Sequence, residues 1–209
     1  MGILKEFGIV IASDVDEVLV NSAKKHHRIL IEEGKKRDWS NVPSYEEMLA
    51  LGGTHQAFAQ YPGYWELNEA MRNNPDFNRG LELIPGALEV SNFLGSILFI
   101  YLTTREEHLA RVTHEELVNN GFPDVPVICR PKGIPLKDTS SWKLDVLRGV
   151  AEATGKKVNM IDDSISLHGV IKAAEDPRLG TILFAGPITP RGNGEKTWPQ
   201  IKQMLKGEK

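Results

Sequence analysis

Near its N-terminus the chain reads Ile9-Val10-Ile11-Ala12-Ser13-Asp14-Val15-Asp16-Glu17-Val18-Leu19, a short apolar run followed by two acids spaced two residues apart. Such a run is typical of a strand covered on both faces in a parallel sheet, although a buried helix can show the same pattern. If the backbone stays extended, Asp14 and Asp16 project to the same side. Two neighbouring carboxylates repel each other unless they share a cation. The stretch therefore predicts a magnesium site in which one carboxylate attacks and the other transfers protons. The alternative is that these acids only cap a helix or form a turn.

Composition limits the classes of protein to which the chain can belong. Its 209 residues suffice for one full domain with a sizeable insertion. The single cysteine, Cys129, cannot form an internal disulfide, which indicates a reducing, cytoplasmic compartment. The sequence shows neither an apolar run of about 18 residues nor a signal peptide, so we expect no membrane association. A net charge of -3 argues against a nucleic-acid polymer and favours a small phosphorylated substrate. The oligomeric state stays open, a homodimer included.

Residues 20–83 contain no second signal of a buried strand and are mostly polar and helical in pattern. One helix is expected from Ser22 toward Gly34. Ser44 and Glu47 have the spacing of a capping box at the start of a second helix, and a third reaches about Arg72. Aromatic residues concentrate here, which favours a small core of the segment's own. The pattern predicts a helical insertion.

From residue 84 onward, strands alternate with helices. The expected strands are Ile97–Leu102, Val125–Ile128, Val158–Ile161 and Thr181–Phe184, with a helix from about Arg105 to Asn120 after the first of them. This alternation predicts a parallel sheet with right-handed crossovers. The fold class is therefore α/β. We expect a Rossmann-like three-layer core from residues 1–19 and 84–209, with a small α-helical cap, residues 20–83, inserted after the first strand.

Polar side chains follow several of these strands. Asp14 and Asp16 follow the first strand, Thr103 the second, and Asp162 with Asp163 the fourth. Open parallel sheets bind ligands at this edge. Lys143, early in the helix before the fourth strand, could reach the same crevice, although a lone lysine is more often solvated surface; Lys132 and Lys137 are the alternatives.

This set of residues resembles the phosphatases of the haloacid dehalogenase superfamily. The resemblance implies that Asp14 is a nucleophile forming an aspartyl-phosphate and that Asp16 is the general acid and base. It further implies that Thr103 and Lys143 hold the phosphoryl oxygens. The implied cofactor is Mg²⁺, surrounded by Asp14, Asp16, Asp162 and Asp163. The chain would then be a phosphomonoester hydrolase.

The first half is also similar to the deoxyribonucleotidases, through Pro62-Gly63-Tyr64-Trp65 and residues 81–89. Glu17 and Arg105 depart from that family's pattern. The likeness implies a nucleoside monophosphate whose base stacks on Tyr64 or Trp65, with Thr104 and Arg105 also contacting the substrate. Three alternatives stay open: a sugar-phosphate or other small-metabolite phosphatase or phosphotransferase, a phosphoacceptor signalling module, and a catalytically silent binding domain. The insertion of residues 20–83 disfavours the signalling module.

Overall fold

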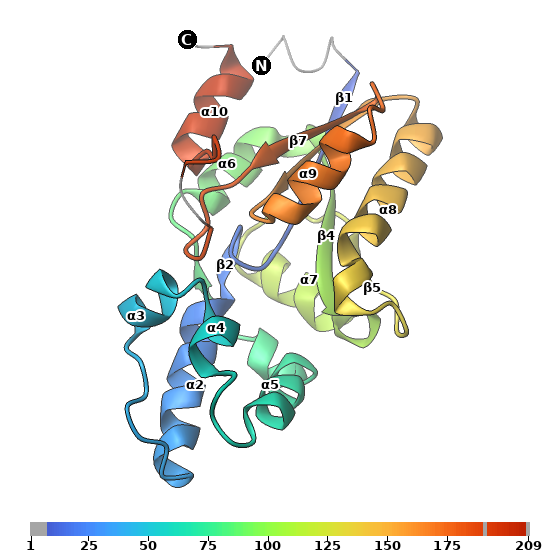
Figure 1. Cartoon of the computed structure of the whole chain (residues 1–209). Coiled ribbons are helices and arrows are strands. Elements are labelled where there is room, and N and C mark those ends of the chain that lie inside the picture. The colour runs from blue at the N-terminus through green and yellow to red at the C-terminus, as the bar shows by residue number, and fades with distance from the viewer. Residues whose placement is uncertain (1–7, 190–191, 208–209) are drawn as a thin grey trace.

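The computed structural model describes residues 8–189 and 192–207 of the chain. Five parallel strands form the central sheet in the order β5-β4-β1-β6-β7 (Figure 1). Their bounds are β1 Ile9–Ser13, β4 Leu98–Glu106, β5 Val127–Arg130, β6 Lys157–Asp162 and β7 Leu179–Leu183. The apolar run near the N-terminus is the middle strand of this sheet, covered on both faces. The predicted parallel sheet is confirmed.

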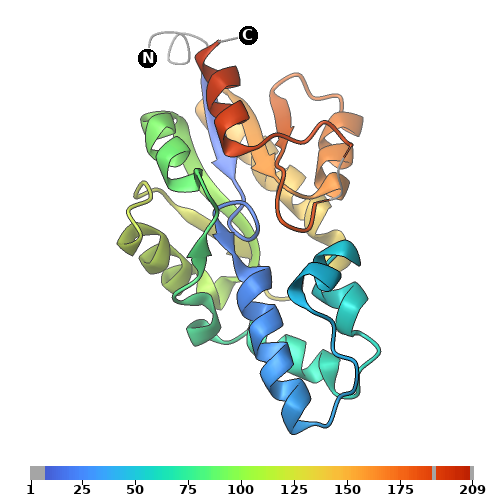
Figure 2. The same cartoon turned by 90° about the vertical axis from the view of Figure 1, so that its left-hand side faces the viewer.

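Helices cover both faces of the sheet, because the side chains of each strand alternate between two apolar clusters. Ile11 packs in one cluster with residues of α6 (Ala87–Leu94), α7 (Ala110–Asn119) and α10 (Trp198–Lys206). Its neighbours in β1 pack in the other cluster, with α8 (Thr139–Thr154) and α9 (Ile165–Ala173). The two views of the chain show these layers (Figure 2). The predicted three-layer α/β core is confirmed.

The helical insertion leaves and rejoins the core at one place, where β2 (Val20–Asn21) pairs antiparallel with β3 (Glu82–Leu83). Its helices lie beyond the C-terminal edge of the sheet (Figure 1) and surround their own core, which includes Leu30, Phe58 and Tyr64. These elements are α2 Ser22–Lys36, α3 Tyr45–Ala50, α4 Thr54–Phe58, α5 Tyr64–Arg72 and the 3₁₀ helix η1 Pro75–Asn78. The predicted capping box of Ser44 and Glu47 is present at the start of α3.

The chain differs from the sequence-based expectation after Thr103. The strand β4 does not end there but continues through Glu106, and the helix expected from Arg105 begins only after the 3₁₀ turn η3 (Glu107–Leu109). Glu106 pairs with Arg130 of β5, and the Arg130 guanidinium donates to the Thr104 carbonyl and the Glu106 carboxylate. These bonds extend the strand beyond its apolar part. Two further 3₁₀ helices are η2 Gly95–Ile97 and η4 Leu136–Asp138.

Two observations bear on the class of protein. Within residues 8–189 and 192–207, every helix is too short or too polar to cross a membrane. Cys129 lies buried in β5 as a free thiol.

Candidate active site

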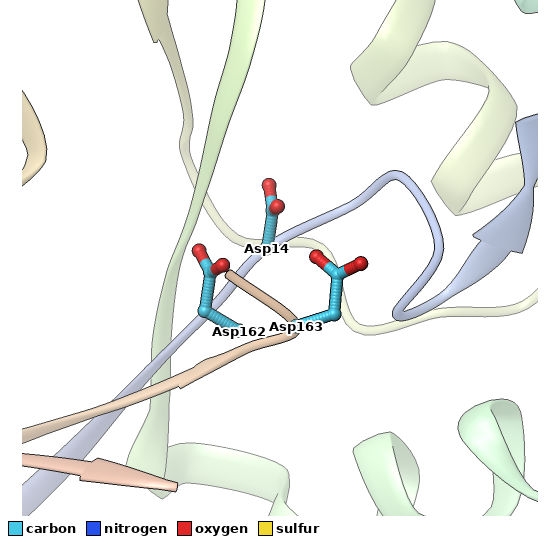
Figure 3. Close-up of side chains that lie close together, drawn as sticks. All are labelled: Asp14, Asp162 and Asp163. Carbon is cyan, nitrogen blue, oxygen red and sulfur yellow. The ribbon is translucent and has the colours of Figure 1, made fainter. Parts of the chain in front are cut away.

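Three carboxylates meet at the C-terminal edge of the sheet. Asp14 follows β1, Asp162 ends β6, and Asp163 comes next along the chain. Because Ser13 lies opposite Ile161 in the parallel pairing of β1 with β6, the acids after these residues become neighbours. One oxygen atom of each carboxylate lies within 4.8 Å of the others. Figure 3 shows the three side chains gathered around one space.

Lys143 of α8 lies among these acids. Its side chain is only 4% exposed, and its Nζ atom lies 2.7 Å from Asp162 Oδ2 and 3.1 Å from Asp14 Oδ1. Burial would lower the pKa of Lys143, but the charges of Asp14 and Asp162 raise it above its ordinary value, so the amine stays protonated. Lys132 and Lys137 are exposed instead. The structure thus brings Lys143, and neither of the two alternatives, to the acids.

One lysine does not balance three acids. Burial raises the pKa of Asp14 to about 7, and burial with the neighbouring carboxylates raises the pKa of Asp163 well above its ordinary value. The buried Asp14 Oδ1 atom has one partner, the Lys143 ammonium at 3.1 Å. Crowded buried carboxylates are the donor set that Mg²⁺ prefers. These three acids therefore fit the predicted metal.

Asp16 is not part of this group. Both of its carboxylate oxygens accept hydrogen bonds from Arg105, at 2.9 Å from Nε and 2.7 Å from the terminal nitrogen. Burial would raise the pKa of Asp16, but Arg105 lowers it below its ordinary value. The Arg105 guanidinium holds the Asp16 side chain apart from the group of Asp14, Asp162 and Asp163, and the role of Asp16 as a metal ligand stays a prediction.

Arg105 reaches Asp16 because β4 continues beyond Thr103 with a shift in its register against β5. The Arg105 guanidinium also donates to the Thr113 hydroxyl at 3.1 Å, which fixes its orientation. Thr103 is fully buried, and its hydroxyl lies 3.5 Å from Asp16 Oδ2. Thr103 and Arg105, both predicted near the acids, therefore contact Asp16. Thr104 lines the adjoining cavity.

Glu17 has a structural role that the sequence did not reveal. Its backbone is left-handed, with φ of 60°. Its Oε1 atom accepts hydrogen bonds of 2.7 Å from the Ser22 hydroxyl and from the Ala23 amide, so it ties the end of the first motif to the start of α2. Burial raises the pKa of Glu17 to about 7. An acid five residues before a helix start carries no recognised capping signal, and this contact could be found only in the structure.

A cavity of about 680 Å³ opens from Asp16 and Arg105 toward the cap. Trp65 lines it and is 51% exposed. Tyr64, its neighbour, is fully buried in the cap core against Phe58. Successive residues of a helix point in different directions, so Tyr64 points into the cap core and does not line the cavity, and a contact of Tyr64 with substrate stays a prediction. Arg72 and Arg130 also line the cavity, although no pattern in the sequence distinguishes them from the other arginines.

Comparison with known proteins places the fold. No family model and no curated protein sequence matches the chain. A haloacid dehalogenase family hydrolase from Deinococcus radiodurans R1, with bound phosphate and sodium, is 17% identical; the match covers 96% of each chain with a TM-score of 0.53. CbbY from Rhodobacter sphaeroides in complex with phosphate is 16% identical, with 91% and 92% coverage and a TM-score of 0.56. A hydrolase from Streptococcus pneumoniae TIGR4 is 13% identical, with 96% and 98% coverage and a TM-score of 0.60.

These matches span nearly the whole chain at low identity, so they establish a shared fold. The chain has the fold of the haloacid dehalogenase-like hydrolases, as its motifs predicted. The narrower likeness to the deoxyribonucleotidases stays a prediction.

Proposed function

We propose that this chain is a magnesium-dependent phosphomonoester hydrolase that acts through an aspartyl-phosphate on Asp14. One observation carries the proposal: the buried Asp14 carboxylate lies beside one buried lysine and two further acids at a ligand-binding edge. If Lys143 served only to form a structural ion pair, one acid beside it would be enough, whereas three acids gather here. The fold, shared with a hydrolase that has bound phosphate and with CbbY in complex with phosphate, supports the same conclusion.

In the first step an Asp14 oxygen attacks phosphorus, and the bond from phosphorus to the leaving oxygen breaks. Negative charge spreads over the equatorial oxygens of the phosphoryl group, and the Lys143 ammonium stabilises it from a site that excludes water. The Thr103 hydroxyl holds one of these oxygens. A magnesium ion held by Asp14, Asp162 and Asp163 would neutralise the charge of the phosphate as it meets these acids.

Asp16 carries the proton. It donates a proton to the departing alkoxide and then takes one from the water that attacks the phosphorus of the aspartyl-phosphate, which frees phosphate and restores Asp14. The Arg105 ion pair favours the deprotonated form that the second step needs. For the first step Asp16 must leave Arg105, since a carboxylate held by a guanidinium is a poor proton donor.

The substrate class has two candidates within this reaction. A sugar phosphate or similar small metabolite fits the polar lining at Asp16, Glu17 and Thr104. A nucleoside monophosphate is favoured by one feature, the half-exposed Trp65 ring on the cavity wall, on which a base could stack. Transfer of the phosphoryl group to a second hydroxyl, in place of water, would use the same residues.

A phosphate-release screen over sugar phosphates and nucleoside monophosphates, with and without Mg²⁺, tests the proposal. We expect release that requires Mg²⁺ and a phosphorylated protein that is acid-stable and hydroxylamine-labile, as an acyl phosphate is. Absence of release from every phosphomonoester in the presence of Mg²⁺ would reject it. Faster release from nucleotides that is lost in Trp65→Ala, with thermal stability unchanged, would select the nucleotide candidate.

A further inference from the structure

Arg72 is a cation in the cavity that lacks a partner. It is the last residue of α5, half-buried, and lines the cavity from the cap side. Among residues 8–189 and 192–207, no hydrogen bond or ion pair engages its guanidinium. A half-buried guanidinium is expensive to leave without acceptors. Its position facing the cavity is therefore suited to an acceptor that arrives from outside the chain.

Two acids of the cavity, Asp16 and Glu106, act on the charge of Arg72, but each forms its ion pair with another arginine. Asp16 is held by Arg105, and the Glu106 carboxylate lies 3.0 Å from Arg130. Both of these arginines are thus already paired, while Arg72 is not.

Two further acids line the cavity, and neither balances Arg72. Glu17 is buried, and burial raises its pKa to about 7, which weakens it as an anion. Glu69 is exposed on α5 and, within the described part of the chain, forms no ion pair with Arg72. The cap wall of the cavity therefore carries one acid and one arginine, with no ion pair between them among the described residues. Burial lowers the pKa of Arg72, and the charges of Asp16 and Glu106 offset this only in part.

Two other residues on the same face of α5 line the cavity with Arg72. Trp65, Asn68 and Arg72 are spaced three, four and seven residues apart, so they share one face of α5, and all three line the cavity. The opposite wall carries Asp16 and Thr104, next to the reacting edge of the sheet. A small molecule bound between these walls has one end near the acids and the other at Arg72.

We infer that the cavity takes a phosphate ester whose leaving group carries a second anionic group, a carboxylate or another phosphate, which pairs with Arg72. The inference rests on the proposed function for the identity of the reacting phosphate. It makes Arg72 a specificity residue, with Asn68 as a neighbouring donor. Simple sugar monophosphates and nucleoside monophosphates lack the second anion, so they bind without this contact.

The test compares ligands that differ only in that group. In the Asp14→Asn protein with Mg²⁺, calorimetry measures the dissociation constants of 3-phosphoglycerate against glycerol 3-phosphate, and of glucose 1,6-bisphosphate against glucose 6-phosphate. We expect the doubly anionic member of at least one pair to bind about tenfold to a hundredfold more tightly. The two pairs distinguish a carboxylate from a second phosphate.

Two variants of Arg72 then test whether this residue causes the preference for the doubly anionic ligand. Arg72→Gln should remove the preference while leaving the singly anionic ligands and the thermal stability nearly unchanged, and Arg72→Lys should restore part of it. Arg111→Gln, on an 89% exposed side chain, is the matched control and should keep the preference. Equal affinity within both pairs, or a preference that survives in Arg72→Gln, overturns the inference. Because binding is read without turnover, failure of the proposed hydrolysis would appear separately, as absent phosphate release by the native chain.

Discussion

Arg105 and Asp16, 89 residues apart in the chain, form a two-point ion pair at the rim of the acids, with distances of 2.9 and 2.7 Å. The Arg105 side chain is 6% exposed and the Asp16 side chain 26%, so the pair is shielded on one side and open to the cavity on the other. The arrangement couples the end of β4 to the loop after β1. The ion pair also holds Asp16, the residue predicted to transfer the proton, in place before a substrate enters.

Arg105→Lys should therefore lower kcat/KM and thermal stability together. A lysine has one point of charge where the guanidinium presents a planar fork, so it cannot hold both oxygens of Asp16 and the Thr113 hydroxyl at once. We expect a stability loss of about 1 to 3 kcal/mol, because buried hydrogen-bonding groups are left unpaired. Urea denaturation and steady-state kinetics measure both effects. Arg111→Lys is the control; equal behaviour of the two variants would show that the Asp16 pair contributes little.

Asp14→Asn should fold normally and release essentially no phosphate. The change removes the attacking oxygen anion but keeps the shape of the side chain, and it relieves crowding among three acids, so stability should not fall. Circular dichroism and the phosphate-release assay provide the measurement. Turnover near the native rate in a well-folded variant would assign the nucleophile to another residue.

Lys143→Ala should reduce kcat on the order of 100-fold or more, because the ammonium stabilises transition-state charge in a desolvated site. It should also destabilise the fold by roughly 3 to 5 kcal/mol, since Asp162 loses its buried partner at 2.7 Å. Lys132→Ala and Lys137→Ala remove exposed lysines and should do neither. Activity is compared at a temperature where every variant is folded. Loss of activity in a control variant with only a mild effect in Lys143→Ala would reassign the phosphate-binding lysine.

Mg²⁺ should raise the melting temperature of the native chain. Asp163→Asn should change both the stability without Mg²⁺ and the gain in stability when Mg²⁺ is added. Without Mg²⁺ the variant should be more stable than the parent, because the high pKa of Asp163 reflects its burial and the repulsion of the neighbouring acids. With Mg²⁺ at about 100 times the parent's Kd, the parent should gain about 2.7 kcal/mol and the variant less. Melting curves with chelator and with Mg²⁺ test both parts. An Mg²⁺ response unchanged by Asp163→Asn would remove that residue from the metal group.

The sequence was sufficient to predict which strand ends meet. An apolar run before Asp14 and another before Asp162 are local signals, and the geometry of a parallel sheet brings such ends to one edge. The orientation of single side chains was not predictable in this way. Tyr64 and Trp65 are adjacent, yet one is buried in the cap core and the other lines the cavity, because the packing of α5 against distant helices decides which face is covered.

The same limit explains Arg105 and Asp16. Spacing correctly placed both near the strand ends but could not show that they bind each other, since the extension of β4 depends on Arg130, 25 residues away. Long-range pairs of this kind leave no periodic signal. Glu17 is a further case, because its carboxylate contacts α2 only after the chain turns through a left-handed residue.

His26, which lines the cavity from the cap, gives a prediction about the pH dependence of stability. It lies in α2, 9% exposed, with its ring edge-on to Phe77 at 5.6 Å and its Nε2 atom buried without a hydrogen-bond partner. Burial, with the nearby charge of Arg72, lowers the pKa of His26 to about 4 from the ordinary 6.5. The folded protein therefore keeps this imidazole neutral at a pH where the unfolded chain has already taken up a proton.

The direction of the effect follows from that difference. Above about pH 6.5 both states are neutral at His26, so the full stability is present; as the pH falls toward 4, proton uptake by the unfolded chain alone removes roughly 3 kcal/mol. His26→Leu cannot take up this proton and should lose less stability between pH 7 and 4.5 than the parent does. Urea denaturation at a series of pH values measures the difference, in which the contributions of the carboxyl groups common to both proteins cancel. Parallel pH profiles for the two proteins would show that His26 is protonated in the folded chain, and hence that the cap core admits a charge beside Phe77.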